Sequence, residues 1–311
     1  MTDSKKCLKC LLPLETGSTP WYGLHEPCFV SWFGLEKPEE FTGIERRSES
    51  GAPKASDKTK GWNTSFFHGK FRKYSAILAG DSYIFKMKQE EAPELPDVEF
   101  VCNQIARSTG LPVPDFYHIE FHGERAFVTK NFVKRSTTAT LNHIYHYLSE
   151  TDRYDCATIA NVIAQTSRPY DVDIFVRACL FDSLIGNHDR HGRNLAFIAT
   201  PKGNSLAPIY DNPSALGIET GTILQAEFAP KGKIWTKNSK EPTAKDYVGE
   251  FRRLNHEDSV RDFFARVDID KILGLVWNSA CSDLMKSAFS RLLARRYEEM
   301  KNAIEQGSKS A

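Results

Sequence analysis

The stretch GNHDRHGRN, residues 186–194, decides the fold, because its neighbours predict a buried helix before it and a hairpin after it. Apolar side chains repeat at helical spacing over 172–185, which indicates a helix with a buried face. Strands are expected at 195–199 and 206–210, joined by the turn sequence PKGN at 201–204. A polar loop held between such elements is well placed to carry chemistry.

Two loop residues and one downstream carboxylate meet the requirements of phosphoryl transfer. Asp189 supplies a carboxylate that can orient an attacking hydroxyl, and Asn194, five positions on, supplies a neutral oxygen ligand for a metal. Asp211, in the run APIYDNPS at 207–214, adds a second carboxylate at the end of the expected hairpin, which suits magnesium. Each residue alone also fits a turn or a helix cap, so the three are interpreted together.

Upstream of this loop, residues 66–133 show a mainly strand pattern. Hairpins are expected from 74–78 with 83–87 and from 116–121 with 126–132, and a helix is expected between them over 97–109. The lysine of the run YIFK, Lys86, ends an apolar strand and fits the cation that holds a triphosphate in line, although alone it would be read as a surface lysine. Glu99, 13 residues on, is the expected ion-pair partner, ahead of Asp97 and Glu94.

Together these motifs resemble the HipA-like kinases of bacterial toxin–antitoxin systems, especially the shorter HipT type. Five family motifs occur in the right order: Y-I-x-K at 83–86, an acidic helix followed by G-L-x-V-P at Glu99 and 110–114, the hinge at 131–135, G-N-x-D-x-H-x-x-N at 186–194, and A-P-x-Y-D at 207–211. The resemblance covers about residues 64–290. It implies an α+β, bilobal, protein-kinase-like fold with a strand-rich N-lobe, a helical C-lobe and ATP in the cleft between them.

The resemblance also implies roles for individual residues. Asp189 would be the catalytic base, and Asn194 and Asp211 would hold magnesium. The residues expected to bind or surround ATP are Lys86 at the phosphates with its partner Glu99, Gly69 and Lys70 in the phosphate loop, Lys130 and Phe132 at the adenine through backbone groups, and His191, which is expected to shape the loop by hydrogen bonding. We expect a kinase N-lobe at 63–135 and a kinase C-lobe at 136–311, preceded by a small Cys/His unit at 1–35 and a linker or mobile segment at 36–62.

The phosphate loop departs from the family pattern S-x-x-G-x-Q. The matching stretch, 64–73, keeps only Gly69, and the usual serine position falls near Phe66. Thr64 or Ser65 could replace that serine as a site of autophosphorylation. With a single glycine, backbone amides approach phosphate less freely, so nucleotide affinity is expected to rest more on the basic side chains at 70, 72 and 73.

The amino-terminal unit contains four soft ligands in two chelating pairs. Cys7 and Cys10 form one pair and, 14 residues later, His25 and Cys28 form the other, which is the spacing of a tetrahedral zinc site. Such a knuckle can fold in few residues because the metal replaces a missing core. Free thiols in a reduced chain are the alternative. Small HipA-like proteins often begin with a similar stretch ending in Phe-Gly, as at 33–34 here.

Composition narrows the class of protein but not its partners. A formal net charge of +1 gives no reason to expect direct nucleic-acid binding or an anionic membrane surface. No run approaches the roughly 20 apolar residues of a membrane helix, and the amino terminus lacks an apolar signal core, so we expect a cytoplasmic protein. The other four cysteines lie in apolar stretches and are expected in the core, as are the apolar residues of 263–293, including Trp277.

The function that the residues and the resemblance favour is an ATP- and magnesium-dependent serine/threonine protein kinase. The resemblance implies a protein target, often an aminoacyl-tRNA synthetase whose phosphorylation stops translation, and a cognate antitoxin partner of the HipB or HipS kind. Three alternatives remain open: a phosphoinositide-type lipid kinase, because those enzymes carry a similar D-R-H-x-x-N loop; a pseudokinase or antitoxin-binding module without turnover; and a protein whose zinc knuckle makes it mainly a binding protein.

Overall fold

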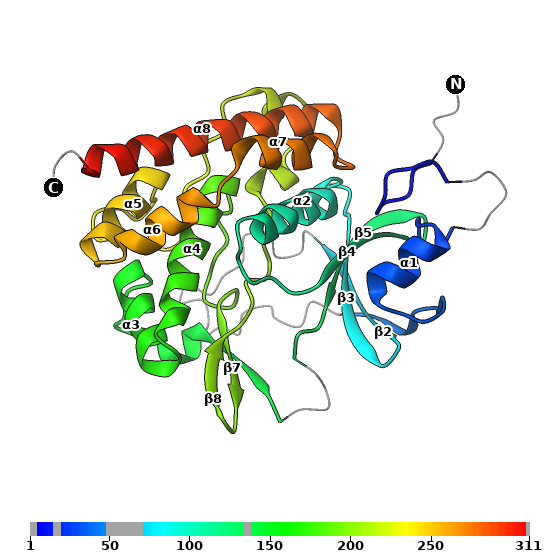
Figure 1. The fold of residues 1–311 in the computed structure, drawn as a ribbon, viewed down its shortest axis with the longest axis horizontal. Coiled ribbons are helices and arrows are strands. Elements are labelled where there is room, and N and C mark those ends of the chain that lie inside the picture. Colours follow the sequence, from blue (N-terminus) through cyan, green and yellow to red (C-terminus); the bar gives the residue numbers. More distant parts are fainter. Residues whose placement is uncertain (1–4, 15–19, 48–70, 134–137, 309–311) are drawn as a thin grey trace.

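The computed structural model describes residues 5–14, 20–47, 71–133 and 138–308 and places them in two lobes. A five-stranded sheet forms the smaller lobe, and helices form most of the larger one (Figure 1). The α+β, bilobal fold predicted from the sequence is confirmed. Within the described ranges, no helix is long and apolar enough to cross a membrane.

The sheet of the smaller lobe is antiparallel throughout and has the strand order β1-β2-β3-β5-β4. Its strands are β1 (Thr42–Arg46), β2 (Arg72–Leu78), β3 (Asp81–Met87), β4 (Phe116–Phe121) and β5 (Glu124–Lys130). Both expected hairpins are present, and each closes through two residues with positive φ, Ala79-Gly80 and His122-Gly123. This left-handed backbone matches the twist of the paired strands and produces tight turns.

Two helices cover opposite faces of this sheet. Alternation along β3 points Tyr83, Phe85 and Met87 to the face that packs against helix α1 (Glu26–Phe33). The opposite face carries Lys86 and lies against helix α2 (Leu95–Ser108). Because α2 also packs its apolar residues into the core of the larger lobe, it joins the two lobes.

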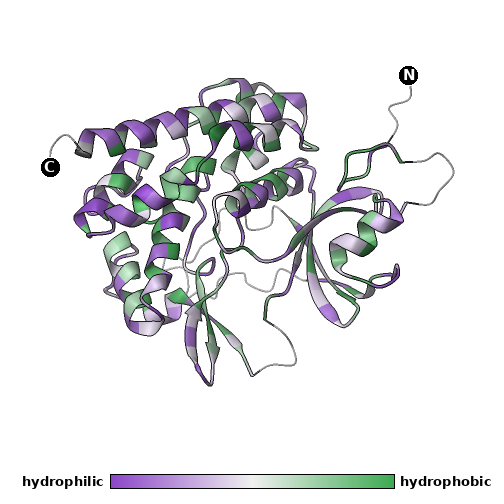
Figure 2. Ribbon diagram, viewed as in Figure 1, coloured by the Kyte–Doolittle hydropathy of each residue, from purple (hydrophilic) through white to green (hydrophobic). Residues whose placement is uncertain are grey.

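The larger lobe is built around helix α4, which is buried on nearly every side. Apolar residues of the ribbon gather toward the contacts between helices, and polar residues lie outward (Figure 2). The helices of this lobe are α3 (Cys156–Thr166), α4 (Tyr170–Ile185), α5 (Ala244–Arg253), α6 (Glu257–Ala265), α7 (Ile269–Trp277) and α8 (Asp283–Ser308), with the 3-10 turns η3 (Ile144–Tyr147), η4 (Ala215–Ile218) and η5 (Gly221–Gln225). Strands β6 (Thr140–His143), β7 (Ala196–Thr200) and β8 (Gly203–Leu206) form a second antiparallel sheet.

The hairpin after the polar loop differs from the prediction in its second strand. Strand β8 ends at Leu206, where the expected strand over 206–210 begins, because the turn is tighter and Gly203 already pairs with Thr200. The following residues turn toward the other lobe, where Ile209 N donates to Pro112 O at 2.7 Å. This contact brings Asp211 close to the smaller lobe.

Three further expectations need correction. Strand β6 lies where only helices were expected, and β1 forms an edge strand within the expected linker at 36–62, whose later part lies outside the described residues. Trp277 is 53% exposed at the end of α7, not buried in the core. The four cysteines expected in the core are buried, as predicted: Cys102, Cys156, Cys179 and Cys281.

Candidate active site

Lys86 lies between the lobes and contacts two carboxylates. Its Nζ is 2.6 Å from Glu99 Oε1 on α2 and 2.5 Å from Asp211 Oδ1 of the larger lobe. The rings of Phe71 and Phe127 lie 5.1 Å and 5.6 Å from the same nitrogen. The ion pair of Lys86 and Glu99 expected from the sequence is therefore present, and the two weaker candidates are engaged elsewhere: Asp97 with His118 and Arg125, and Glu94 with the start of α8.

Burial and the two carboxylates act against each other on the lysine. Burial alone would lower the pKa of Lys86, but Asp211 and Glu99 raise it above its ordinary value, so the ammonium keeps its charge. Burial also raises the pKa of the fully enclosed Glu99, and Lys86 offsets part of that effect. The lysine is thus a fixed cation whose position is set by a buried partner from the same lobe.

Asp211 is the more open partner of Lys86. Its side chain is 35% exposed, whereas that of Glu99 is enclosed. Partial burial opposes its ionisation, yet the adjacent Lys86 and Lys73 hold the pKa of Asp211 well below its ordinary range. Its backbone is left-handed with φ of 52°, a conformation uncommon for non-glycine residues and frequent at functional sites. Asp211 is therefore an ionised carboxylate presented toward the space between the lobes.

The polar loop begins where Gly186 ends helix α4. Its φ is 72°, and a Cβ at this position would lie 2.6 Å from Pro230 Cγ, so only glycine fits. Asn187 then shapes the turn, because its side-chain oxygen accepts from Asp189 N at 2.9 Å while its amide group donates to Asp182 at 2.9 Å. These contacts place Asp189, which is buried, directly after the helix.

Asn194 and His191 complete the loop through hydrogen bonds to its own backbone. Asn194 Nδ2 donates to Asp189 O at 3.0 Å, and Arg193 N donates to His191 Nδ1 at 3.1 Å. His191 Nε2 lies 3.8 Å from Asp189 Oδ2. Burial lowers the pKa of His191 to about 3, so the ring is neutral at pH 7. His191 thus has the contacts expected of a residue that shapes the loop.

Arg190 connects the loop to the segment that carries Asp211. Its guanidinium forms a two-pronged pair with Asp182 at 2.8 Å and donates to Tyr210 O at 2.6 Å and Asn212 Oδ1 at 2.6 Å. It also donates to Asn194 O at 3.2 Å. No role for Arg190 or Asp182 was predicted from the sequence. The available signal was Asp182 among apolar residues in the last turns of α4, since a buried carboxylate there requires a cation nearby.

The residues expected at the adenine lie at the end of β5 and directly after it. Lys130 N donates to Asp115 O and Asn131 N to Ser82 O, both at 2.8 Å, so these two amides serve the fold. The Lys130 side chain pairs with Asp81 at 2.5 Å. The Phe132 ring lies 5.7 Å from the ring of Tyr210, beside the segment that carries Asp211. Gly69 and Lys70, together with Thr64 and Ser65, lie outside the described residues.

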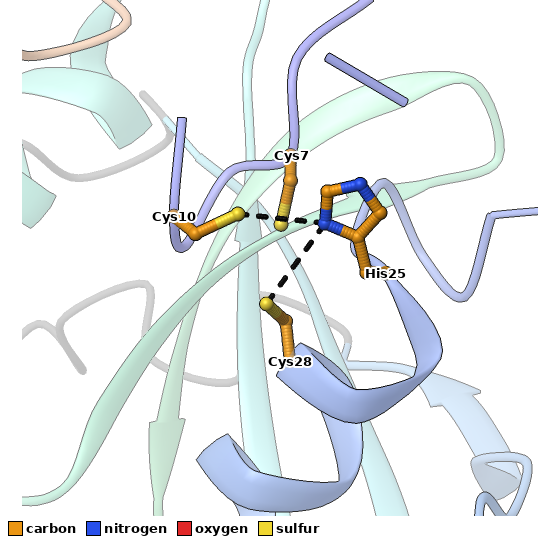
Figure 3. Close-up of side chains that lie close together, drawn as sticks. All are labelled: Cys7, Cys10, His25 and Cys28. Carbon is orange, nitrogen blue, oxygen red and sulfur yellow. Dashed lines mark hydrogen bonds between the residues drawn. The ribbon is translucent and has the colours of Figure 1, made fainter. Parts of the chain in front are cut away.

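The four amino-terminal ligands converge on one point, as Figure 3 shows for Cys7, Cys10, His25 and Cys28. Their ligand atoms lie within 4.8 Å of one another, and His25 Nδ1 is 3.4 Å from Cys10 Sγ and 4.0 Å from Cys28 Sγ. His25 Nε2 lies 3.0 Å from Pro13 O, which fixes the ring with Nδ1 toward the sulfur atoms. This Cys3His cluster has the donor set of a zinc site.

The charges in this cluster also suit a cation. Burial and the neighbouring thiols of Cys10 and Cys7 raise the pKa of Cys28 to about 11. Burial has the same tendency at Cys7, but nearby backbone amides outweigh it and lower the pKa of that thiol to about 7. Crowded sulfur atoms cannot all ionise without a positive charge between them, so the residues fit a divalent metal.

The cluster is attached to the sheet of the smaller lobe. Glu120 N on the edge strand β4 donates to Tyr22 O at 2.7 Å, and Phe33 of α1 stacks on Tyr117 with ring centroids 4.1 Å apart. A Cβ at Gly23 would lie 2.9 Å from Glu120 Cβ, so the chain approaches the strand closely. Residues 20–33 therefore cover an edge and a face of the sheet, and their aromatic rings pack mainly into the lobe.

A fold with a strand-rich lobe, a helical lobe and a lysine paired with carboxylates between them is that of a kinase. The HipA-like C-terminal domain matches residues 53–281, and the chain belongs to the HipA-like kinase family. The resemblance inferred from the sequence is confirmed.

Similar proteins agree with this family. A Sinorhizobium fredii protein named "Putative kinase Y4dM" is 27% identical over 187 residues, covering 53% of this chain and 45% of that protein. A Haemophilus influenzae protein named "Putative kinase" is 28% identical over 161 residues, covering 44% and 46%. The chain thus spans about half the length of these curated relatives.

Two solved structures share the fold. The Helicobacter pylori proinflammatory kinase CtkA has a TM-score of 0.63 at 19% identity, over 78% of this chain and 94% of that chain. HipA of Shewanella oneidensis, solved with HipB and its operator DNA, has a TM-score of 0.52 at 14% identity, over 71% of this chain and 58% of that chain. At these identities the comparison concerns the fold, and the chemistry must be argued from the residues.

Proposed function

We propose that the chain is a serine/threonine protein kinase that uses ATP and magnesium. The observation that carries the proposal is the position of Lys86 Nζ, 2.6 Å from Glu99 and 2.5 Å from Asp211, at the junction of the two lobes. A lysine fixed by a helix carboxylate in one lobe and facing an ionised aspartate of the other is the arrangement that protein kinases use to hold the triphosphate.

Asn194 and Asp211 are the residues that would hold magnesium. Both offer oxygen atoms, which this hard cation prefers, and when bound it would neutralise charge that develops on the phosphates. The Asn194 side chain already donates its amide nitrogen to Asp189 O at 3.0 Å, which leaves its oxygen as the metal-binding atom. Arg190 positions both residues through the Asn194 and Tyr210 carbonyls.

Asp189 would orient the acceptor hydroxyl and accept its proton as the γ-phosphoryl group is transferred. The bond from the γ-phosphorus to the bridging oxygen breaks, a bond to the acceptor oxygen forms, and ADP leaves. Lys86 would contact the phosphates, and the Lys130 carbonyl and the Phe132 backbone would receive the adenine. Gly69 and Lys70, which lie outside the described residues, are proposed from the family resemblance alone to contact the phosphates.

The target and the partner are proposed by analogy with the family. The HipA structure contains HipB and operator DNA, which supports a cognate antitoxin of the HipB or HipS kind for this chain as well. An aminoacyl-tRNA synthetase is the proposed target, and arrest of translation the proposed consequence. We also propose that the Cys3His cluster binds one structural zinc ion that holds residues 5–14 and 20–33 against the sheet.

Transfer of radiolabelled phosphate from ATP tests the proposal. Purified chain, magnesium and a bacterial lysate are incubated, and labelled proteins and lipids are analysed, with phosphosites mapped on the proteins. We expect label on serine or threonine, which Asp189→Asn abolishes while ATP binding stays intact. The matched control is Asp270→Asn, an exposed aspartate on α7, which should label like the wild type.

Each alternative outcome identifies a rival function. Label in the lipid fraction alone would point to a lipid kinase. Binding of magnesium and ATP with no transfer by the wild-type chain would point to a pseudokinase. Retained transfer by Asp189→Asn would refute the role of Asp189 as the base.

A further inference from the structure

A cavity lies beside the polar loop, in the larger lobe. It encloses about 690 Å³ and shares His188 with the loop, one residue before Asp189. Its other walls come from the segment directly before α3 and from the chain between η5 and α5. The lining residues are Asp152, Arg153, Tyr154, His188, Lys231, Gly232, Lys233, Trp235, Lys240 and Glu241.

The floor of this cavity is fixed by backbone hydrogen bonds. Trp235 N donates to Tyr154 O at 3.1 Å, and Cys156 N donates to Trp235 O at 2.8 Å, so the two segments pair as a short parallel bridge. The Tyr154 hydroxyl donates to Arg190 O at 2.9 Å, which connects this wall of the cavity to the polar loop. A Cβ at Gly232 would lie 2.1 Å from Tyr247 Oη, so the wall requires glycine there. These contacts fix the walls of the cavity relative to the polar loop.

The charges around the cavity are mainly positive. Four of its lining residues are lysine or arginine and two are acidic, which leaves an excess of two positive charges. Lys240 Nζ lies 5.0 Å from the Trp235 ring, and the Arg153 guanidinium lies 6.0 Å from it while also pairing with Asp155 at 3.3 Å. Burial, together with Lys233, lowers the pKa of His188 to about 4, so this ring adds no charge at pH 7.

We infer that this cavity binds acidic side chains that flank the acceptor hydroxyl in the protein substrate. The inference rests on the proposed kinase function and adds a preference for the substrate sequence. This basic recess begins one residue from the proposed base, so it would lie next to the part of the substrate that carries the acceptor hydroxyl. A substrate carboxylate bound there would contact lysine and arginine side chains.

A short acidic peptide suits this recess better than a nucleic-acid backbone does. Asp152 and Glu241 stand in its walls, where they would repel a continuous run of phosphates. The whole chain carries a net charge of only +1, which supplies no extended basic surface for a polynucleotide. A short acidic peptide needs only the recess itself.

Peptide binding to the full chain carrying Asp189→Asn tests the inference without turnover. Two fluorescein-labelled peptides are compared by anisotropy at about 50 mM salt, Glu-Glu-Ser-Glu-Glu and Lys-Lys-Ser-Lys-Lys. We expect at least roughly tenfold tighter binding of the acidic peptide. Lys231→Glu with Lys240→Glu should remove that preference, because both side chains line the cavity and are exposed at its mouth.

The control has the same change in net charge elsewhere on the surface. Lys202→Glu with Lys271→Glu alters two exposed lysines outside the cavity and should change the affinity less than about twofold. Equal binding of the two peptides, or equal loss in both double variants, would overturn the inference. A single-stranded oligonucleotide that binds more tightly than the acidic peptide, and only with Lys231 and Lys240 intact, would overturn it in favour of a nucleic-acid site.

The result is separable from a failure of the proposed function. Acidic preference in binding, with no phosphate transfer by the wild-type chain, would remove the kinase assignment and keep the recess as a peptide site. Transfer by the wild-type chain to peptides without acidic preference would keep the kinase assignment and remove the inference.

Discussion

Replacing Arg190 with alanine is the most direct test of how the site is held together. The guanidinium is 2% exposed and donates to five acceptors in the polar loop, helix α4 and the segment that carries Asp211. Without it, the Asn187 amide is the remaining side-chain donor to the buried Asp182 within the described part of the chain. The Tyr210 and Asn194 carbonyls lose the donor that ties them to each other.

The expected cost follows from the loss of one partner of a buried ion pair. Such a loss leaves an uncompensated charge and typically lowers the free energy of unfolding by about 3–5 kcal/mol. A domain of ordinary stability has about 5–15 kcal/mol in total, so the variant should fold but melt earlier, by roughly 6–20 °C. Arg190→Lys keeps the charge but not the planar fork, and we expect about half of that loss.

Chemical and thermal unfolding measure the effect, and a matched arginine supplies the control. Arg266 forms a similar two-pronged pair with Asp262, at 2.9 Å and 3.0 Å, but its side chain is 48% exposed. Because solvent screens that pair, Arg266→Ala should cost less than about 1 kcal/mol. The view that Arg190 holds the two segments together is refuted if the free energy of unfolding of Arg190→Ala lies within about 1 kcal/mol of the wild-type value. It is also refuted if Arg190→Ala melts at no lower a temperature than Arg266→Ala.

Three other perturbations test separate parts of the molecule. Asp211→Ala should weaken binding of magnesium and ATP by at least roughly tenfold in calorimetry, and an unchanged affinity would count against a metal-ligand role. Elemental analysis should find one zinc per chain, and Cys10→Ser should lose the metal and melt earlier; a variant that keeps both would exclude a structural site. Because burial lowers the pKa of His191 to about 3 from 6.5, the unfolded chain binds more protons between these values. Stability from this residue is therefore complete above pH 6.5 and falls by about 2.7 kcal/mol by pH 4.5, and His191→Asn should flatten the pH profile by that amount.

Much of the smaller lobe could be predicted because its signals are local. The turns Ala79-Gly80 and His122-Gly123 specify tight hairpins, and strand alternation alone places Lys86 opposite the apolar face. A helix packed on that polar face must present a carboxylate to a buried ammonium, and Glu99 lies on that helix. The ion pair thus follows from patterns within about twenty residues of sequence.

The features that were not predicted depend on how segments fold back onto one another, which no local pattern in the sequence specifies. Arg190 has partners from 4 to 22 residues away, and no periodicity in the sequence shows that a polar side chain will be enclosed there. Strand β6 pairs with β7 across more than fifty residues, and its sequence has no strong strand pattern. The end of β8 was misplaced for a related reason: Ile209 N hydrogen-bonds to Pro112 O of the other lobe, and such a contact outweighs local strand propensity.

On the proposed assignment, the charges at the site explain why magnesium must accompany the nucleotide. Lys86 contributes one positive charge and faces two carboxylates, of which Asp211 has a pKa held well below its ordinary range. A bare triphosphate entering beside Asp211 would therefore meet an anion, and Lys86 alone cannot neutralise both. A divalent cation between Asp211 and the phosphates reverses that repulsion and frees Lys86 to contact the phosphates, while Glu99 continues to hold the lysine in place.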